Sequence, residues 1–522
     1  MKSLKKILAA LIAVILTATI LLWILAKSVK PEVIKNYVSS QLSELTHQNS
    51  KVEGDISWQV FPRPGIKITK IQIGDASSPQ NYSVKLENLL FNLKITPLLS
   101  GKLVFSELKV DGFKITINPA ALPKVIINEQ EEEEPQDKDV KNNLTEQFAI
   151  ERFLLSRGQI SIIENKQTIS LSGLQIGGEQ FNLQKMVFPL QFKSNIELSE
   201  DSHTILKAYA NFKGSISLSP SVFSNPITVL QNTPLDGVIS FQNVKIKQFK
   251  IAKISAHAKT KPGVLFLNPL TFNLYNGESV GDLNYEFASK KLTINQTATN
   301  LDSSKFISDS LNKSLVKGSL DLSLHAQANL QHENWQGSTT GNGSFTIKNG
   351  LIESINLDKV VVETGDKISK LFAIETVKKE RALELGQFNN PEFFKGGTNF
   401  NLLTFQYQLK DGKLESNSLV LQTDKLQLKG EGSLDLNNEN LYSNLFAKVT
   451  FLEAGLNKIQ QLLGGSFPIL ISGTLSEPRV IPDLQKINPI LTRIWLKDSL
   501  TKPVKQLGNT LKIILDNGQN LL

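Results

Sequence analysis

The feature that most constrains this chain is a strict alternation of apolar and polar side chains from Gly318 to Leu330. Successive side chains of a β-strand point to opposite faces of a sheet. A period of two residues therefore predicts a strand with one apolar and one solvated face. At about 3.3 Å per residue the part from Leu320 to Leu330 spans roughly 36 Å, about twice the length of an ordinary strand. Its apolar positions are Leu320, Leu322, Leu324, Ala326, Ala328 and Leu330.

The same alternation returns between residues 426 and 436, and shorter versions recur along the chain. We therefore predict a mainly β fold built on one long, one-sided sheet. The central question is what covers its apolar face. The apolar positions of this second stretch are Leu426, Leu428, Gly430, Gly432, Leu434 and Leu436.

The composition indicates a folded chain and narrows its chemistry. Hydrophobic residues make up 40% of the sequence and charged residues 20%, a balance typical of folded proteins. The net charge of +8 is modest for 522 residues. Together with the lack of a long basic block or a nucleic-acid motif, this argues against a nucleic-acid partner. The chain has no cysteine, which excludes disulfides, thiolate metal sites and cysteine nucleophiles.

The N-terminus carries a run without charge from Ile7 to Ala26, preceded by three lysines. A helix of about 20 residues spans the hydrocarbon core of a bilayer, so the run predicts a single transmembrane helix. The lysines favour an orientation that places the rest of the chain outside the cytoplasm. A cleaved signal peptide is the alternative, although the apolar region of such a peptide is normally shorter. The predicted anchor positions are Ile7, Leu11, Ile15, Ile20, Trp23 and Ala26.

Helical spacing of apolar residues predicts helices at residues 31–45, 303–311, 357–374 and 451–463. The tail from Asp483 contains two amphipathic basic segments, which predict either a helical cap on the sheet or contact with an anionic membrane surface. The acidic run from Glu129 to Asp139 cannot bury a core and lacks the ligand spacing of a calcium loop, so it predicts a solvated linker.

These signals predict six segments. They are a cytoplasmic N-terminus (1–6), the anchor (7–26), a β region that begins with a helix (31–128), the acidic linker (129–143), an elongated β-groove region (144–482) and the basic helical tail (483–522).

Several dipeptides with glycine in second position lie between or before strand-like runs. Such pairs are strong signals for a β-hairpin, because glycine and asparagine accept the positive φ angles of tight hairpin turns. We therefore predict hairpin turns at these dipeptides, which are Asp111-Gly112, Arg157-Gly158, Asn276-Gly277, Asn349-Gly350 and Asp411-Gly412.

No pattern in the sequence indicates an enzyme. Residues 277–281 fit the G-x-S-x-G motif around Ser279. That motif needs a helix after the serine, and here a strand-like run follows, so we predict that Ser279 lies in a hairpin turn. No phosphate-binding or dinucleotide-binding motif is present, and we predict no catalytic residue, no metal site and no cofactor. We expect solvated side chains for the histidines, which are His47, His203, His257, His325 and His332.

Several segments together resemble the AsmA family of Gram-negative envelope proteins. After the apolar run come a helix-like stretch and a G-x-[IL]-x-W-x-[VF]-x-P segment that contains Gly54, Ile56, Trp58 and Pro62. Further similar stretches lie at residues 341–361, 426–436 and 467–484. The order of these segments along the chain carries the resemblance. Residues 120–300 contribute little to it.

The resemblance implies a long, curved β-sheet whose inside is an apolar groove, on a chain anchored in the inner membrane and reaching into the periplasm. It implies a role in phospholipid transport to the outer membrane or in outer-membrane assembly. The expected partners are phospholipid, the inner membrane, and outer-membrane or periplasmic proteins. A structural alternative is an assembly or tethering protein with a closed β core and no lipid cargo. We expect the groove to be lined by Leu320, Leu322, Leu324, Leu330, Leu426, Leu428, Leu434 and Leu436.

Overall fold

The structure is a computed structural model of the chain. It describes residues 31–46, 49–59, 65–74, 82–94, 104–118, 149–164, 166–219, 231–311, 314–331, 337–353, 355–373, 383, 388, 396–451, 454–474 and 477–501. The predicted anchor at 7–26, the acidic linker at 129–143 and the tail beyond residue 501 lie outside the described residues. None of the described helices is long and apolar enough to cross a membrane.

The chain is mainly β, as the alternation predicts, and it divides into two compact units, Met1–Leu267 and Asn268–Leu522, here called unit 1 and unit 2. The division falls within the segment predicted as one elongated region. The strands of unit 1 are β1 (Ser50–Val52), β2 (Ile56–Gln59), β3 (Gly65–Ile73), β4 (Tyr82–Leu93), β5 (Val104–Ile117), β6 (Ala149–Glu164), β7 (Gln167–Asn182), β8 (Val187–Glu200), β9 (His203–Ser217), β10 (Leu235–Ile246) and β11 (Phe249–Lys261). β12 (Val264–Leu274) crosses the division.

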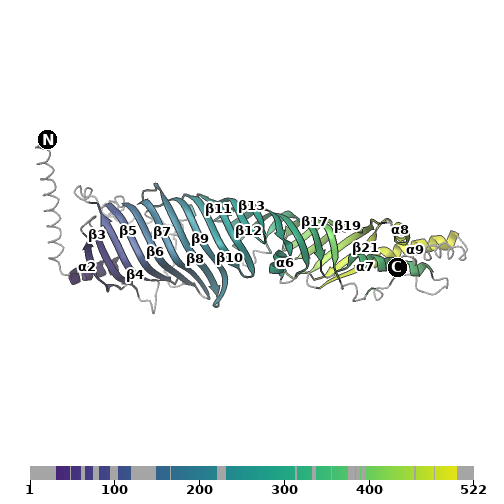
Figure 1. Cartoon of the computed structure of the whole chain (residues 1–522), viewed down its shortest axis with the longest axis horizontal. Helices are drawn as coiled ribbons and strands as arrows, with labels where there is room; N and C mark the ends of the chain where they lie inside the picture. Colours follow the sequence, from purple (N-terminus) through teal and green to yellow (C-terminus); the bar gives the residue numbers. More distant parts are fainter. Residues whose placement is uncertain are drawn as a thin grey trace, which may run out of the picture. The chain divides into compact units, whose positions relative to one another are not determined.

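In unit 1, β1 and β2 both pair with β3, and from β3 to β11 each strand pairs with the next along the chain (Figure 1). All these pairs are antiparallel except β5 with β6, which is parallel. A parallel pair requires the chain to return to the end of the sheet at which it started, and this takes a long connection. The acidic segment predicted as a linker falls within that connection.

Unit 2 is also a meander, with antiparallel neighbours throughout its described pairs. Its strands are β13 (Gly277–Glu286), β14 (Lys291–Asp302), β15 (Val316–Asn329), β16 (Thr340–Ile352), β17 (Thr398–Lys410), β18 (Lys413–Gln422), β19 (Leu426–Asp435), β20 (Leu441–Val449), β21 (Phe467–Gly473) and β22 (Pro478–Pro482). The two stretches of strict alternation are β15 and β19, as predicted.

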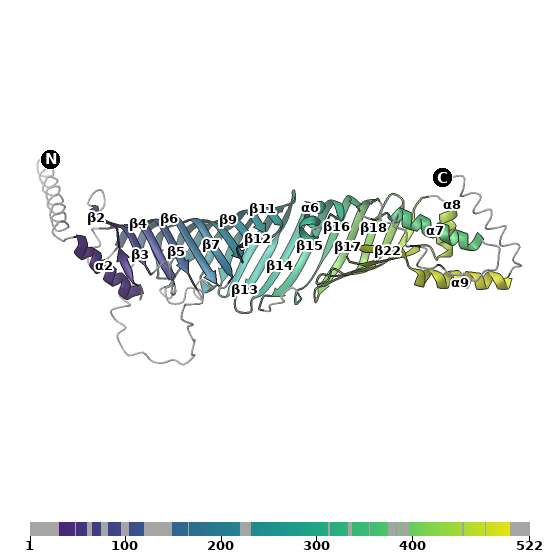
Figure 2. The same ribbon diagram turned by 90° about the horizontal axis from the view of Figure 1, so that it is seen from below.

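The predicted helices are confirmed within a few residues at their ends. They are α2 (Pro31–Thr46), α6 (Ser303–Leu311), α7 (Leu357–Ala373), α8 (Ala454–Leu462) and α9 (Leu484–Thr501). In unit 1, α2 packs on β1 to β3. In unit 2, α6 contacts β14 and β15, whereas α7, α8 and α9 gather near the C-terminal strands and contact β22, β20 and β21 respectively (Figure 2). The described part of the tail is thus a cap on the sheet.

Two of the predicted hairpin turns are confirmed and three are wrong. Residues 275–276 form a turn directly before β13, as predicted. Residues 411–412 form the turn between β17 and β18, also as predicted. By contrast, Asp111-Gly112, Arg157-Gly158 and Asn349-Gly350 lie inside β5, β6 and β16. The prediction of Ser279 in a turn is also wrong, because Ser279 is the third residue of β13.

These three internal dipeptides mark interruptions of the strand ladders. In unit 1 the interrupted positions have positive φ angles, 50° at Lys70, 74° at Gly112, 53° at Arg157 and 61° at Gly173. An extra residue in a strand changes the phase of its alternation, and it increases the local twist of the sheet. Thus Ile66 and Ile68 before Lys70, and Ile71 and Ile73 after it, can face the same side. We call the positions Lys70, Gly112, Arg157 and Gly173 the interruption line of unit 1.

Ionic contacts connect neighbouring strands along the interruption line of unit 1. Arg157 Nη2 lies 2.6 Å from Asp111 Oδ2 and 3.2 Å from Glu87 Oε2. The Ser156 hydroxyl donates a hydrogen bond of 2.8 Å to the Asp111 carboxylate. The hydrogen bond from Arg157 lowers the pKa of Asp111 below its usual value. Neighbouring strands are thereby tied together at the point where their backbone ladder is interrupted.

Unit 2 has a similar line, with φ angles of 57° at Asn300, 148° at Gly318 and 48° at Asn349. The Asp321 carboxylate accepts a hydrogen bond of 2.9 Å from the Asn300 backbone N–H, and Lys348 Nζ lies 2.8 Å from its Oδ2. The hydrogen bond from Lys348, followed by that from Asn300, lowers the pKa of Asp321. A carboxylate therefore ties strands together across the interruption in each unit.

Candidate functional site

The candidate site is the apolar face of the sheet in each unit, and in unit 1 this face carries a continuous row. Residues directly opposite each other in neighbouring strands point to the same face. The register places one apolar residue from each strand from β2 to β11 in a single line, here called the unit 1 row. Its members are Ile56, Ile68, Leu89, Val110, Leu155, Ile176, Phe192, Phe212, Ile239 and Ala256.

The unit 1 row is only partly covered by the described chain. Val38 and Leu42 of α2 pack with the cluster around Ile68 at the start of the sheet. Over β5 to β11 the described residues contribute no second sheet, and the extensive helix contacts of unit 1 lie at β1 to β3. Most members of the row, Ile176 and Ile239 among them, are accordingly half-buried. This face is therefore open to an apolar ligand.

In unit 2 the apolar face contains a buried row and an open row. The buried one, here called the core row, crosses β14 to β21, the range of strands that α6, α8 and α9 contact. Apart from the half-buried Leu403, its members are between 0 and 3% exposed. They are Leu301, Leu320, Ile347, Leu403, Leu421, Leu428, Ala447 and Phe467.

The second row of unit 2, here called the open row, crosses β13 to β20. Its leucine and isoleucine members are half-buried, and Ala326 is 8% exposed. The row lies on the same face as the core row, because the residues of each strand in the two rows have matching parity or are separated by an interruption. Its members are Leu283, Ile294, Ala326, Gly341, Leu409, Leu414, Leu434 and Leu441.

The sequence matches the model of one known family, the AsmA family, over residues 1–216 and 221–419. The chain belongs to the AsmA family. No curated protein and no solved structure matches it. The resemblance found in the sequence is thus confirmed, and the match includes residues 120–300, where the motifs contributed little.

The leucines predicted to line a groove in this AsmA-family chain fall into three groups. Leu320, Leu426 and Leu428 are 0, 1 and 0% exposed, so the described chain already covers them. Leu322, Leu324 and Leu434 are half-buried on the apolar face. Leu330 and Leu436 follow the last residues of β15 and β19 and are 37 and 51% exposed. The lining of a groove by these leucines stays a prediction.

Sequence reasoning did not single out most of the open row. Leu283, Ile294, Leu409, Leu414 and Leu441 come from strands whose alternation is shorter than that of β15. Each strand shows its apolar parity in the sequence, but only the register shows which residues are neighbours across strands. A search for parity in every strand would have found these residues as members of one face, without their order.

Glycines on the apolar face lie under aromatic rings from the neighbouring strand. A Cβ built on Gly178 would lie 2.6 Å from the Phe153 ring, and one on Gly158 would lie 2.1 Å from the Phe113 ring. In unit 2, a Cβ on Gly343 would lie 2.6 Å from the hydroxyl oxygen of Tyr407. Because glycine leaves space above its own strand, the large ring can lie across the face.

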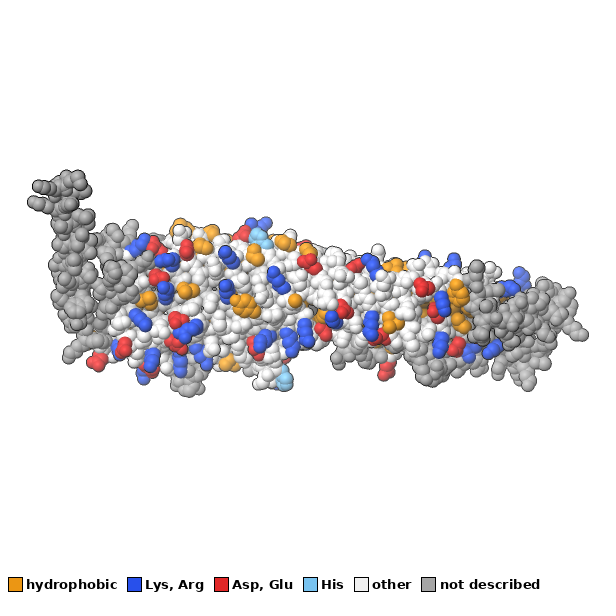
Figure 3. Space-filling model, in the orientation of Figure 1, with side chains coloured by type: hydrophobic (Ala, Val, Ile, Leu, Met, Phe, Trp, Pro, Cys, Tyr) orange, Lys and Arg blue, Asp and Glu red, His pale blue; other side chains and the backbone are white. Residues whose placement is uncertain are grey.

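The opposite face of the sheet is polar. Figure 3 shows one face of the molecule, on which Lys, Arg, Asp and Glu side chains are scattered together with separate hydrophobic ones. His325 was expected to be solvated on this face. It is instead half-buried, and its Nδ1 contacts Asn295 Oδ1. Ser279 has the parity of the apolar face, is 6% exposed and donates its hydroxyl hydrogen bond to Gln296 Oε1 at 2.6 Å.

Proposed function

We propose that this chain binds phospholipid acyl chains along the unit 1 row and the open row, and supports lipid transport to the outer membrane. The observation that carries the proposal is the continuity of these rows, in which most strands contribute an apolar side chain that the described chain leaves partly uncovered. Membership of the AsmA family agrees with a role in lipid transfer or envelope assembly. The proposal includes no catalytic step.

A surface that binds lipid must offset the free energy of exposing an acyl chain to water. Each CH₂ of an acyl chain costs about 0.8 kcal/mol in water, so a chain of about fifteen costs roughly 12 kcal/mol. Neighbouring strands lie about 4.8 Å apart, so the nine steps from β2 to β11 span roughly 43 Å and the seven from β13 to β20 roughly 34 Å. Half a bilayer core is about 15 Å thick. Each row is therefore longer than one acyl chain.

An acyl chain that slides along such a row meets no site at which it is bound much more tightly than elsewhere. The apolar attraction is non-directional, and it changes little when a chain slides by one strand onto the next side chain of the same kind. The rings that lie over Gly158, Gly178 and Gly343 fill what would otherwise be gaps between strands. Most members of these rows carry apolar side chains, so the head group would stay in water while the acyl chain moves.

The location is part of the proposal. We propose that residues 7–26 anchor the chain in the inner membrane as a single-pass protein, with the bulk of the chain in the periplasm. Because α2 follows the proposed anchor within a few residues, the start of the unit 1 row would lie next to the membrane that supplies the lipid. Phospholipid and the inner membrane are thus the proposed partners.

The test exploits two neighbouring residues that face opposite sides. Ile239 belongs to the unit 1 row and is half-buried, whereas Val238 is 56% exposed on the other face. Ile239→Glu places a carboxylate on the lipid surface, where desolvation opposes the acyl chain. We expect the purified full-length Ile239→Glu variant to carry about half of the wild-type phospholipid by mass spectrometry, because the open row still binds, while Val238→Glu carries the wild-type amount. Equal lipid in both variants, or none in the wild type, would contradict the proposal.

A second candidate function is an assembly or tethering protein for outer-membrane proteins. The buried core row favours it locally, since there the apolar side chains are covered by the described chain as in an ordinary core. Strand addition by a partner requires a free sheet edge. At the last described strand that edge is short and begins and ends with Pro478 and Pro482, which cannot donate a backbone hydrogen bond. We therefore rank lipid binding first.

A further inference from the structure

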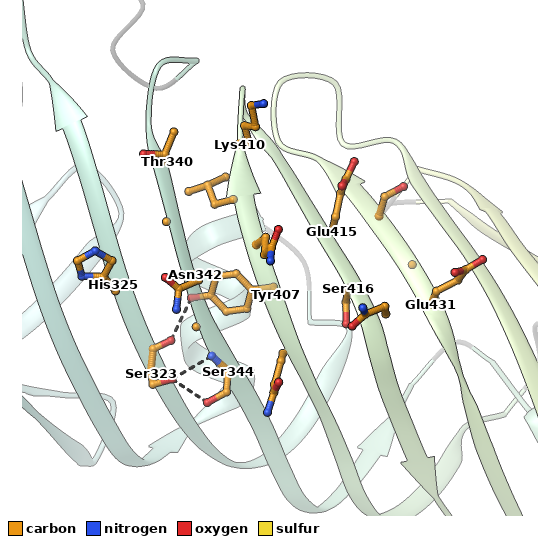
Figure 4. Close-up of a pocket in the computed structure, with 18 of the residues that line it drawn as sticks. Ser323, His325, Thr340, Asn342, Ser344, Tyr407, Lys410, Glu415, Ser416 and Glu431 are labelled. Atoms are coloured by element: carbon orange, nitrogen blue, oxygen red, sulfur yellow. Dashed lines mark hydrogen bonds between the residues drawn. The ribbon is translucent and has the colours of Figure 1, made fainter.

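The polar face of unit 2 contains a hollow that the lipid proposal does not use. Its volume is about 1070 Å³, and its walls come from β15 to β20. This volume is at the upper end of the range for small-molecule sites. In Figure 4 the side chains of His325, Asn342, Glu415 and Glu431 rise from β15, β16, β18 and β19 on one side of the sheet.

The register orders part of this lining into a single row across the strands. Six neighbouring strands each contribute one polar side chain, and each member is the direct cross-strand partner of the next. We call this set the polar row. Its members are His325, Asn342, Gln408, Glu415, Ser433 and Tyr442, and all six line the hollow.

The polar row offers hydrogen-bonding groups that the described chain leaves unused. The side chains of Asn342, Gln408 and Glu415 make no hydrogen bond to any described residue, and all three are exposed. Gln406, next to the row on the same face, is also exposed, with no side-chain bond among the described residues. An amide side chain both donates and accepts, as a sugar hydroxyl does. The hollow therefore presents donors and acceptors together.

Charge and composition disfavour other classes of small ligand. The charged lining residues are Lys410, Glu415 and Glu431, so the hollow does not attract an anion. Among the described residues no group of His, Asp and Glu side chains could hold a metal ion. Apart from Leu409, Tyr407 and Tyr442, the residues that line the hollow are polar or glycine, so the hollow lacks the unbroken row of apolar side chains that an acyl chain needs. A neutral, polyhydroxylated ligand fits the groups that remain.

The spacing of the polar row fits a linear glycan. Neighbouring strands lie about 4.8 Å apart, close to the length of one sugar unit, so a glycan that crosses the strands meets a new side chain at each unit. At one end of the row Tyr442 is 50% exposed, and its ring can cover the C–H face of a sugar. We propose that this hollow binds a neutral oligosaccharide of about five sugar units, one for each step between neighbouring strands of the polar row.

The experiment uses the full-length protein in detergent. Isothermal titration with the pentasaccharide of β-1,4-linked N-acetylglucosamine tests a glycan of the cell-wall type, and maltopentaose tests a plain glucose chain. We expect saturable binding of at least one of them. The double substitution Asn342→Ala with Gln408→Ala removes two amide groups that can hydrogen-bond to the sugar. It should weaken binding about tenfold, and Tyr442→Ala should weaken it further.

A matched control lies on the same face. Gln422 is exposed near the other end of β18, has the parity of the polar face and does not line the hollow, so Gln422→Ala should bind the sugar as the wild type does. The lipid content of the Asn342, Gln408 double variant should also stay unchanged, because its side chains lie on the opposite face from the open row. Absence of saturable binding of both sugars would overturn the proposal. Equal affinity of the wild type and the double variant, or preference for an acidic peptide, would also overturn it.

Discussion

At the residue scale, burial separates leucines that look alike in the sequence. Leu428 and Leu414 both have the apolar parity of their strands. Leu428 is 0% exposed in the core row, whereas Leu414 is half-buried in the open row. A buried leucine stabilises the fold through the contacts that surround it on all sides. A half-buried leucine has part of its surface left for a ligand.

This difference predicts opposite effects for the same substitution. Leu428→Ala should lower the free energy of unfolding by about 2–5 kcal/mol, because it leaves a cavity in the packed core, and it should lower Tm accordingly. Leu414→Ala should change Tm much less but reduce the phospholipid that co-purifies. Thermal scans and lipid mass spectrometry on the two variants provide the measurement. A larger Tm decrease for Leu414→Ala than for Leu428→Ala would contradict the assignment of the two rows.

At the scale of elements, the interruption lines connect strands through charged side chains. In unit 2 the Asp321 carboxylate of β15 holds the Asn300 backbone N–H of β14 and the Lys348 ammonium of β16. The interruption removes ladder hydrogen bonds at this point, so the carboxylate replaces part of the lost connection. The pKa of Asp321 is lowered by these hydrogen bonds, that from Lys348 being the strongest cause.

The lowered pKa of Asp321 predicts how stability depends on pH. An aspartate with a folded-state pKa below its unfolded value of about 3.9 stabilises the fold above that value and loses this effect as pH falls through the folded pKa. The wild type should therefore have a higher Tm than Asp321→Asn at pH 7, and the difference should shrink below about pH 4. In a Lys348→Met background the pH-dependent part should be smaller. A Tm difference that stays constant from pH 7 to pH 3 would contradict the role of the carboxylate.

At the scale of the whole molecule, each compact unit carries its own apolar row, which raises the question of whether the rows act in series. A conduit needs every section open, whereas a carrier uses each section independently. Bound lipid and transferred lipid therefore report different things. The amount of bound lipid measures how much of the apolar surface is occupied. The rate of lipid transfer depends on an unbroken path along the rows.

A single charge in each row distinguishes the two cases. Ile239→Glu interrupts the unit 1 row, and Leu434→Glu interrupts the open row. In a conduit each variant alone should abolish transfer of a fluorescent phospholipid between donor and acceptor membranes, while about half of the bound lipid remains. The double variant should show the same loss of transfer as either single variant. If each single variant retained about half of the wild-type transfer rate, the chain would act as a carrier with independent sites. Val280→Glu, at a position 46% exposed on the polar face, is the matched control in unit 2.

The sequence by itself determined the elements and their faces. The parity of Leu320 to Ala328 established β15 and its apolar side, and helical spacing located α6, α7 and α8 within a few residues. These signals are local, because a side chain's direction follows from its own backbone. Only the tertiary structure decided whether Asn349-Gly350 forms a turn or an interruption, since both need the same positive φ. It also decided that Leu428 is covered while Leu414 stays open, because parity gives a residue its face, and only the packing of distant helices decides whether that face is buried.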